Sequence, residues 1–347
     1  MAIPVVDFGA CSLAQERAEE RVEGEQLRAL SEELRAAFTQ VGFVFLKNSG
    51  ITQDEVERVM DMSRRFFLLP EELKKPFSRG SFANNLNHGW VSLEAERLNP
   101  SRPGDLKESF NTSSFHPDIV TILFLSTDFT KAEVPDQHSL NSGSMAPLSV
   151  QLWPCSGSLA GFQETHASFF QRCRELSLRV LRLLAHGLGL EPDLFLRAHG
   201  LIGSDQNGST LRSLYYPPVS RRPVKEGQLR CGEHSDYGSI TLLFQSCDGL
   251  QVCNHSGEFI SAPTIPGAVL VNIADLMQRW TSDRLVSVRH RVLLPPAGDA
   301  GTRQALAFFV QPDDQALVSC CDGSSKYPPV KAGAYLSERF RESYGQS

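Results

Sequence analysis

The stretch CGEHSDYGSITLLFQ, residues 231–245, places His234 and Asp236 one residue apart, directly before a run typical of a β-strand. On an extended segment, residues i and i+2 point to the same face. Both side chains can therefore reach one point in space. Holding a transition metal there needs a third protein ligand, which must come from elsewhere in the chain.

The best candidate for that third ligand is His290, in the segment LVSVRHRVLL. Val288, His290 and Val292 alternate onto one face of a predicted strand, so His290 is expected to point inward. Two histidines and a carboxylate on a β-scaffold suit non-haem Fe(II) and leave coordination positions open. However, a His-x-Asp pair is common by chance, and an inward histidine is also typical of a hydrogen-bonded core residue. The surrounding residues must decide between these interpretations.

An arginine thirteen residues after His290 supports the metal interpretation. Arg303 opens the segment RQALAFFVQP, in which every second residue shares its face and the next two of these are alanines. A guanidinium among small apolar neighbours is costly to bury without an anion. An organic carboxylate would satisfy it in bidentate geometry. Tyr216, at the end of TLRSLYY, could share that carboxylate. Taken alone, Arg303 also fits a surface salt bridge, and Tyr216 fits core packing.

The wider pattern predicts helices and strands in the first half of the chain and short strands in the second. Strands are expected at residues 3–9 and 42–50, with apolar stripes of helices over 27–38 and 56–66. A long amphipathic helix is expected over 167–190. Beyond Thr210, short strand candidates separated by turn residues favour a β-barrel or sandwich. They are residues 210–216, 238–245, 250–254, 257–263, 267–273, 286–294 and 305–312.

Composition narrows the class of protein. The chain has 347 residues, 41% of them hydrophobic and 21% charged, as in globular proteins. A net charge of −6 without a basic block argues against nucleic acid as a partner. No apolar run approaches a membrane span, and the N-terminus lacks signal-peptide features. The eight dispersed cysteines are expected to be free thiols, and the location to be cytoplasmic.

A series of motifs carries a family resemblance. In chain order they are IPVVDF, GFVFLKNSG, LPEELK, DLKESF, LYYPP, HSDYGSITLL, GLQV, GAVLVNIADLMQRWTSD, SVRHRV and RQALAFFVQP. The series resembles the isopenicillin N synthase-like branch of the Fe(II)/2-oxoglutarate-dependent dioxygenases. The resemblance implies a mainly β protein with a double-stranded β-helix (jelly-roll) core and a helical N-terminal region. The expected regions are an N-terminal region (1–119), an insertion or flexible loop (120–154), a supporting helix (155–205), the jelly-roll core (206–320) and a C-terminal helix or tail (321–347).

The resemblance also implies roles for individual residues. Fe(II) would be bound by His234, Asp236 and His290. The cosubstrate 2-oxoglutarate would be bound by Arg303 and Tyr216, and the substrate pocket would include Asn111 and Phe309. No catalytic residue is implied beyond the metal ligands. O₂ is the further cosubstrate, ascorbate is an additional candidate, and the partner is a small-molecule substrate. Asp275 is expected to cap the turn before the third ligand, and the protein is expected to be a monomer.

Two positions depart from the family pattern. Ala305 stands where the family usually has serine, and Leu214 where it often has asparagine. A hydrogen bond to a charged group is worth roughly 1.5–3 kcal/mol, so 2-oxoglutarate could bind about tenfold more weakly. A same-fold Fe(II) oxidase that does not consume 2-oxoglutarate is therefore an alternative, as are a Zn(II) hydrolase and a non-catalytic jelly-roll binding protein. The substrate, and the choice among hydroxylation, desaturation and ring closure, stay open.

Overall fold

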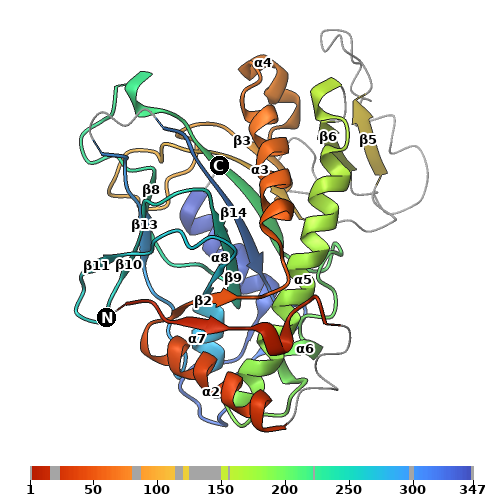
Figure 1. Cartoon of the computed structure of the whole chain (residues 1–347), viewed down its shortest axis with the longest axis vertical. Helices are drawn as coiled ribbons and strands as arrows, with labels where there is room; N and C mark the ends of the chain where they lie inside the picture. The colour runs from red at the N-terminus through yellow and green to blue at the C-terminus, as the bar shows by residue number, and fades with distance from the viewer. Residues whose placement is uncertain are drawn as a thin grey trace.

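The structure is a computed structural model, and two β-sheets that face each other form its centre (Figure 1). It describes residues 2–15, 24–79, 87–113, 120–124, 150–154, 157–221, 223–296 and 301–344. Helices cover the outer face of the larger sheet, and the smaller sheet lies on the opposite side (Figure 1). This arrangement confirms the expected class, mainly β with a helical N-terminal region.

The larger sheet has eight strands in the order β1-β2-β12-β9-β14-β7-β4-β3. In that order they are Val5–Asp7, Phe43–Lys47, Val269–Ile273, Ile240–Gln245, Arg303–Val310, Thr210–Tyr216, Glu108–Thr112 and Gly89–Val91. The β1–β2 pair is parallel, and every other neighbouring pair is antiparallel. The strands of the N-terminal region thus extend the sheet of the predicted core at both of its edges.

The smaller sheet has four antiparallel strands in the order β11-β10-β13-β8. In that order they are Phe259–Ser261, Leu250–Cys253, His290–Val292 and Cys231–His234. Apolar side chains from both sheets meet in one buried cluster, which includes Phe43, Tyr216, Val252 and Ala305. The narrow space between the sheets is where the alternation of Arg303, Ala305 and Ala307 directs these side chains.

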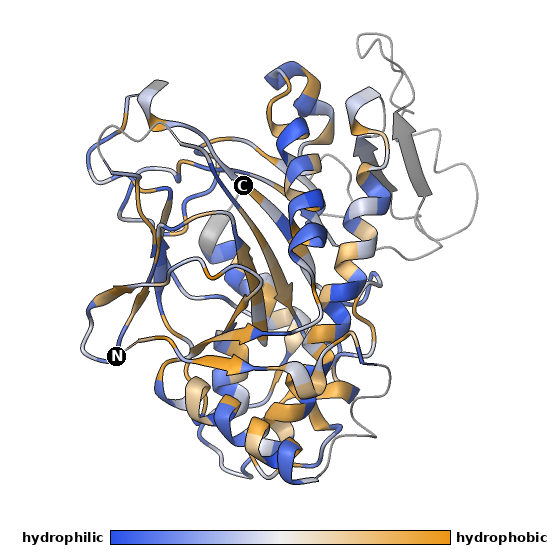
Figure 2. Ribbon diagram, viewed as in Figure 1, coloured by the Kyte–Doolittle hydropathy of each residue, from blue (hydrophilic) through white to orange (hydrophobic). Residues whose placement is uncertain are grey.

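Three long helices form the layer behind the larger sheet: α2 (Gly24–Gln40), α3 (Gln53–Phe67) and α5 (Phe162–Gly187). Helix α3 begins with a capping box, in which the Thr52 hydroxyl accepts from the Glu55 amide and the Glu55 carboxylate accepts from the Thr52 amide. Apolar residues at helical spacing bury one face of α5 against the sheet. The hydropathy of the ribbon in Figure 2 follows this division, with apolar strands beside amphipathic helices.

The shorter elements complete the fold. The helices are α4 (Glu71–Lys74), α6 (Leu194–Arg197), α7 (Asp275–Trp280) and α8 (Ala332–Tyr344). The 3₁₀ turns are η1 (Gly9–Cys11), η2 (Lys75–Phe77), η3 (Gly157–Leu159) and η4 (Val219–Arg221). Strands β15 (Leu317–Val318) and β16 (Val330–Lys331) pair with each other, as do β5 (Val120–Phe124) and β6 (Val150–Pro154).

Part of the expected insertion or flexible loop, residues 120–154, is in strands. At the two ends of this segment, β5 and β6 form a parallel pair. The polar stretch TKAEVPDQHSLNSGSMAPLS between them lies outside the described residues. Strand β4 was not predicted, because its sequence ESFNT is short and mostly polar although all five residues are buried. Seven cysteines in the described part of the chain are free thiols, as predicted, and Cys155 lies outside it.

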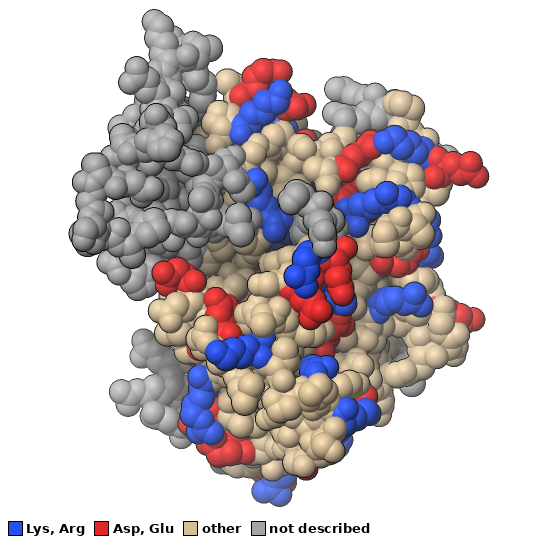
Figure 3. Space-filling model, turned by 180° about the vertical axis from the view of Figure 1, so that it is seen from behind, with Lys and Arg blue, Asp and Glu red and all other residues tan. Residues whose placement is uncertain are grey.

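Surface features bear on the expected partners. On the face shown in Figure 3, basic and acidic side chains are interspersed among uncharged ones. None of the helices in the described ranges combines the length and hydropathy needed to cross a membrane. The exclusion of nucleic acid, the monomeric state and the division of the chain into five regions stay predictions.

Candidate metal centre

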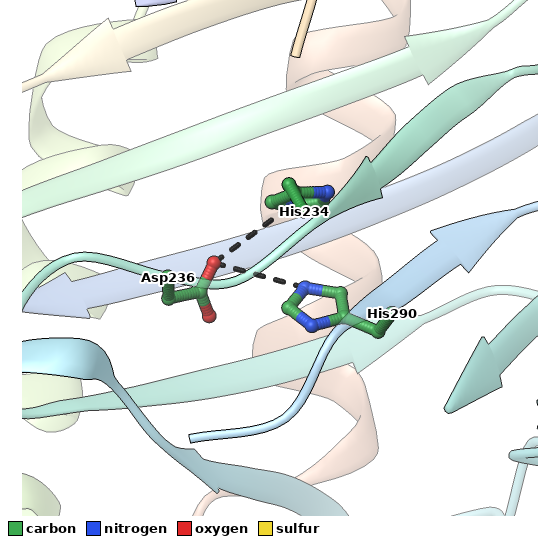
Figure 4. Close-up of side chains that lie close together, drawn as sticks. All are labelled: His234, Asp236 and His290. Atoms are coloured by element: carbon green, nitrogen blue, oxygen red, sulfur yellow. Dashed lines mark ion pairs between the residues drawn. The ribbon is translucent and has the colours of Figure 1, made fainter. Parts of the chain in front are cut away.

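His234, Asp236 and His290 converge on one point between the two sheets, as predicted. Each offers a ligand atom, and these atoms lie within 4.8 Å of one another. The Oδ1 atom of Asp236 is 3.7 Å from Nε2 of each histidine, and Figure 4 shows this oxygen facing both rings. His234 ends β8, His290 begins β13, and the two residues are paired across these strands. Strand register therefore fixes the separation of the two imidazoles.

Backbone contacts orient both imidazole rings. Nδ1 of His234 lies 2.9 Å from the carbonyl oxygen of Gly232, and Nδ1 of His290 lies 3.1 Å from that of Val288. A carbonyl oxygen can only accept, so in each neutral ring Nδ1 carries the proton and donates. The lone pair of each Nε2 is then directed at the space beside Asp236. This is the tautomer that a histidine requires to bind a metal through Nε2.

The two carboxylate oxygens of Asp236 have different environments. Oδ2 accepts hydrogen bonds from the Thr241 hydroxyl at 2.7 Å and the Asn272 amide at 2.8 Å. Oδ1 faces the histidines and is left for a cation. Burial acts to raise the pKa of Asp236, but His290, His234 and the two hydrogen bonds outweigh it and lower that pKa. The side chain is therefore held as a carboxylate with one oxygen available.

Burial, followed by the neighbouring His234, lowers the pKa of His290 to about 4. The imidazole is therefore neutral at physiological pH. A neutral imidazole can bind a metal without first releasing a proton. His290 is 7% exposed, which confirms its predicted inward orientation, and its ring meets Phe43 edge to face with centroids 5.5 Å apart.

Asp275 was expected to cap the turn before the third ligand, but its side chain makes no capping hydrogen bond at the start of helix α7. Ala274 occupies the N-cap position, and no side chain there accepts a capping hydrogen bond. Instead, the Asp275 carboxylate accepts from the Ser235 hydroxyl at 3.0 Å and the Ser287 hydroxyl at 2.6 Å. Its amide donates to the carbonyl oxygen of Asp236 at 2.8 Å. Asp275 thus links the two segments that carry the candidate ligands.

Arg303 is 1% exposed and lines the cavity next to the His-Asp-His site. Its Nη2 donates to Oε1 of Gln245 at 2.9 Å, and its Nε donates to the carbonyl oxygen of Cys247 at 3.3 Å. Its Nη1 is buried and has no hydrogen-bond partner among the described residues. Within that same part of the chain, no carboxylate lies within ion-pair distance of this guanidinium. A buried cation with one unused donor is a site prepared for an anion.

Tyr216 lies beside this donor, because β7 and β14 pair Tyr216 with Arg303. The Arg303 guanidinium carbon is 4.9 Å from the centroid of the Tyr216 ring. Burial raises the pKa of Tyr216 to about 12 against the opposing charge of Arg303, so its hydroxyl stays protonated. Both side chains line one cavity, which also reaches the three candidate metal ligands.

The two departures from the family pattern face each other. Ala305 and Leu214 form a cross-strand pair, and both line the same cavity. The cavity is therefore apolar at the position where the family pattern has two polar side chains. The next pair on the same face toward the strand end is Arg303 and Tyr216, which keeps its polar groups.

A second cavity also reaches His234 and Asp236. Arg212, Tyr237, Phe309 and Phe340 are among the side chains that line it. Phe309, which was expected in the substrate pocket, lines this cavity, and the guanidinium carbon of Arg212 is 5.5 Å from its ring centroid. Asn111 is fully buried behind the wall, where its Oδ1 accepts from Nε of Arg212 at 2.8 Å.

Buried charges support the wall between the two cavities. Lys107 Nζ lies 2.6 Å from Asp105 Oδ2 and 2.9 Å from Glu96 Oε2. Glu96 Oε1 in turn lies 3.0 Å from Nη1 of Arg212. Anions and cations thus alternate in one row of contacts, in the order Asp105, Lys107, Glu96 and Arg212. The charges compensate one another, which is the condition for burying them.

Sequence reasoning missed several of these residues. Arg212 could have been found, since it lies two and four residues before Leu214 and Tyr216 and so shares their strand face. Tyr237 directly follows the His-x-Asp pair. Glu96 and Phe340 gave no local signal, because they reach the site from a loop and from the C-terminal helix.

Two family models match this chain. The one described as the 2OG-Fe(II) oxygenase superfamily matches residues 207–312, which include all three candidate metal ligands. The one described as the non-haem dioxygenase in morphine synthesis N-terminal matches residues 3–133.

Relatives match along most of the chain. The 2-oxoglutarate-Fe(II) type oxidoreductase ppzD of Metarhizium majus is 31% identical over 330 residues, which cover 91% of this chain and 90% of the relative. The 2-oxoglutarate-dependent dioxygenase gloF of Glarea lozoyensis is 30% identical over 318 residues, which cover 87% and 89%.

Solved structures show the same fold. A full-length Neurospora crassa protein in complex with alpha-KG (2-oxoglutarate) superposes with a TM-score of 0.76 at 29% identity, covering 97% of this chain and 95% of that protein. The complex of the same protein with alpha-KG and thymine has a TM-score of 0.77 at 28% identity, covering 99% and 97%. Because sequence and fold match such relatives almost from end to end, through the His-Asp-His site itself, this chain belongs to the 2OG-Fe(II) oxygenase superfamily.

Proposed function

We propose that the protein is an Fe(II)- and 2-oxoglutarate-dependent dioxygenase that hydroxylates a small organic molecule. His234, Asp236 and His290 hold the metal, and Arg303 with Tyr216 holds the distal carboxylate of 2-oxoglutarate. One observation carries the proposal. The guanidinium of Arg303 is buried beside the His-Asp-His site with one donor unused. A non-catalytic binding protein or a hydrolase would have no need for this arrangement.

The charges of the site support this cosubstrate. Fe(II) bound to the Asp236 carboxylate has a net charge of +1, and Arg303 adds a second positive charge in the same cavity. Lys107 also lines the cavity, but Asp105 and Glu96 already compensate it. A dicarboxylate with one acid group at each positive centre would neutralise the site. The 2-oxoglutarate dianion meets this condition.

The donor set fits Fe(II), since two neutral imidazoles and one carboxylate are the ligands of non-haem iron oxygenases. When bound, iron and 2-oxoglutarate supply the activation of O₂. Thr241 and Asn272 direct one oxygen of Asp236 toward the metal. Arg303 and Tyr216 orient the cosubstrate. Ala305, together with Leu214, keeps the cavity apolar and limits the access of water.

The second cavity is the proposed substrate pocket. Phe309, Tyr237 and Phe340 give it aromatic walls, and it opens directly onto His234 and Asp236. Because Glu96 and Arg212 are already paired in this wall, an uncharged organic group is favoured there. The thymine bound in the Neurospora crassa structure is a neutral small molecule of this kind.

Anaerobic addition of Fe(II) and then 2-oxoglutarate to the metal-free protein tests the proposal. A weak visible charge-transfer band, formed with the wild type and absent in Arg303→Met, is the expected result. Succinate release in the presence of candidate small molecules would then identify the substrate. Iron binding without the band would replace the proposal by an oxidase that does not use 2-oxoglutarate. No iron binding at all would overturn it.

A further inference from the structure

Helix α8, the C-terminal helix of Figure 1, supplies one wall of the proposed substrate pocket. Phe340 lines the pocket, and its ring meets that of Tyr237 at 6.1 Å between centroids. The guanidinium carbon of Arg79 lies 5.5 Å from the Phe340 centroid on another side. A substrate in this pocket would therefore touch the helix.

The last turns of α8 are held by very few side chains. Ala332 and Leu336 bury the first part of the helix. Of the described side chains from Ser337 to Glu342, only Arg339 and Phe340 are not exposed. The position of this part of the helix thus depends mainly on two residues, and both of them contact the site.

Arg339 connects the helix to the metal centre. Its Nη2 lies 3.1 Å from Oδ2 of Asp275, and its guanidinium carbon lies 4.9 Å from the centroid of the Tyr237 ring. Asp275 is the residue that binds both ligand-bearing segments, through the hydroxyls of Ser235 and Ser287. One carboxylate is therefore shared by the helix, by the segment of His234 and Asp236, and by the segment that leads to His290.

We propose that α8 and the metal centre are energetically coupled through the Arg339–Asp275 ion pair, with Arg339 as a positioning residue. Substrate that packs on Phe340 stabilises the position of α8. Through Arg339, this also stabilises the segments that carry the metal ligands. The inference rests on the proposed function, since it requires a metal at the His-Asp-His site. Surface ion pairs commonly contribute little, but Asp275 is 19% exposed and already accepts two hydroxyls, so this pair has a fixed geometry.

Coupling between two sites is reciprocal, so the test needs no substrate. If an ordered α8 stabilises the metal-binding arrangement, then metal binding must also order α8. We would measure amide hydrogen exchange with and without Mn(II) plus 2-oxoglutarate, which form no turnover complex with O₂. In the wild type, amides of residues 336–342 should exchange more slowly when metal and 2-oxoglutarate are bound, by a factor of about five or more. A factor of about five is the lower end of typical coupling between sites. The short helix α4, which in the described part of the chain shares no hydrogen bond or ion pair with Asp275, should not change.

Variants separate coupling from general stabilisation. Arg339→Gln should bind Mn(II) and protect the segments around His234 and His290 while losing the added protection of α8. Arg339→Lys, which keeps the charge, should recover part of it. Arg341→Gln is the matched control, because Arg341 is exposed on the same helix, and it should behave as wild type.

Three outcomes are decisive. Protection of α8 that disappears in Arg339→Gln and persists in Arg341→Gln supports the coupling. Protection of the ligand segments alone, with α8 unchanged in the wild type, overturns the coupling and leaves the proposed function in place. Protection of neither region means that no metal is held, and both proposals fall.

Discussion

Replacing Arg303 by methionine should weaken cosubstrate binding strongly and leave the stability of the cosubstrate-free fold nearly unchanged. The guanidinium is expected to make two charge-assisted hydrogen bonds to the distal carboxylate through N–H groups that Gln245 and Cys247 leave unused, each worth about 1.5–3 kcal/mol. Their loss predicts a Kd for 2-oxoglutarate that is about 10²- to 10⁴-fold higher. A buried charge without a partner lowers the stability of a fold. Removing such a charge therefore does not usually lower that stability further.

The cosubstrate-free fold should therefore tolerate this substitution. Arg303→Met removes the hydrogen bonds to Gln245 and Cys247. It also removes the buried unpaired Nη1, which costs about 1–3 kcal/mol. These contributions offset each other, so the free energy of unfolding without cosubstrate should stay within about 1 kcal/mol of wild type.

Anaerobic titration of the Mn(II) protein with 2-oxoglutarate, and denaturant unfolding without it, give the two quantities. Arg291→Met is the control, since that guanidinium is already paired with Glu233 and Gln251. It should lower stability and leave the Kd within about threefold, because its guanidinium does not line the cosubstrate cavity. The reasoning would be refuted by an Arg303→Met protein that binds 2-oxoglutarate nearly as well as wild type. It would also be refuted by one destabilised by about 3–5 kcal/mol, the cost of breaking a buried pair.

Three further predictions concern Ala305, Asn272 and two buried histidines. Ala305→Ser restores a hydroxyl in the cosubstrate cavity and should tighten 2-oxoglutarate binding about tenfold, measured by the same titration; unchanged affinity would show that the hydroxyl is not missed. Asn272→Leu removes the 2.8 Å hydrogen bond that orients Asp236 and should weaken Mn(II) binding about 10- to 100-fold, and equal binding would argue against this role. Burial lowers the pKa of both His166 and His199 from 6.5 to about 4. The unfolded chain therefore binds more protons between these values, so the stability is complete above pH 6.5 and falls as the pH drops toward 4, by about 3 kcal/mol for each histidine. Denaturant unfolding at pH 7 and pH 5 should show this slope, and it should flatten when both are replaced by glutamine.

The sequence predicted the parts of the site that local alternation determines. His234 and Asp236 share a face because they are two residues apart on an extended segment. Arg303 and Ala305 line the cavity for the same reason. The strands beyond Thr210 were predicted because they are apolar and separated by turn residues.

Contacts between distant segments could not be predicted in this way. Glu96 meets Arg212 across 116 positions of sequence. The polar strand β4 is buried because its residues find partners elsewhere, such as Glu108, which accepts from Lys74 and from the Trp90 indole. The family resemblance led to the expectation that Asp275 caps the turn before the third ligand. Its tertiary partners, Ser235 and Ser287, took precedence.

The larger sheet limits which sequence blocks related proteins can exchange. The two family models divide the chain into sequence blocks, but hydrogen bonds of β12 to β2 and of β7 to β4 join those blocks into one sheet. If residues 207–312 were excised, β12 and β7 would become exposed edge strands. Exposed edge strands are prone to pairing with other molecules. Neither block can therefore be exchanged between proteins independently of the other. A chimera that takes its iron-binding half from one relative must also inherit, or rebuild, the matching strands of the other half.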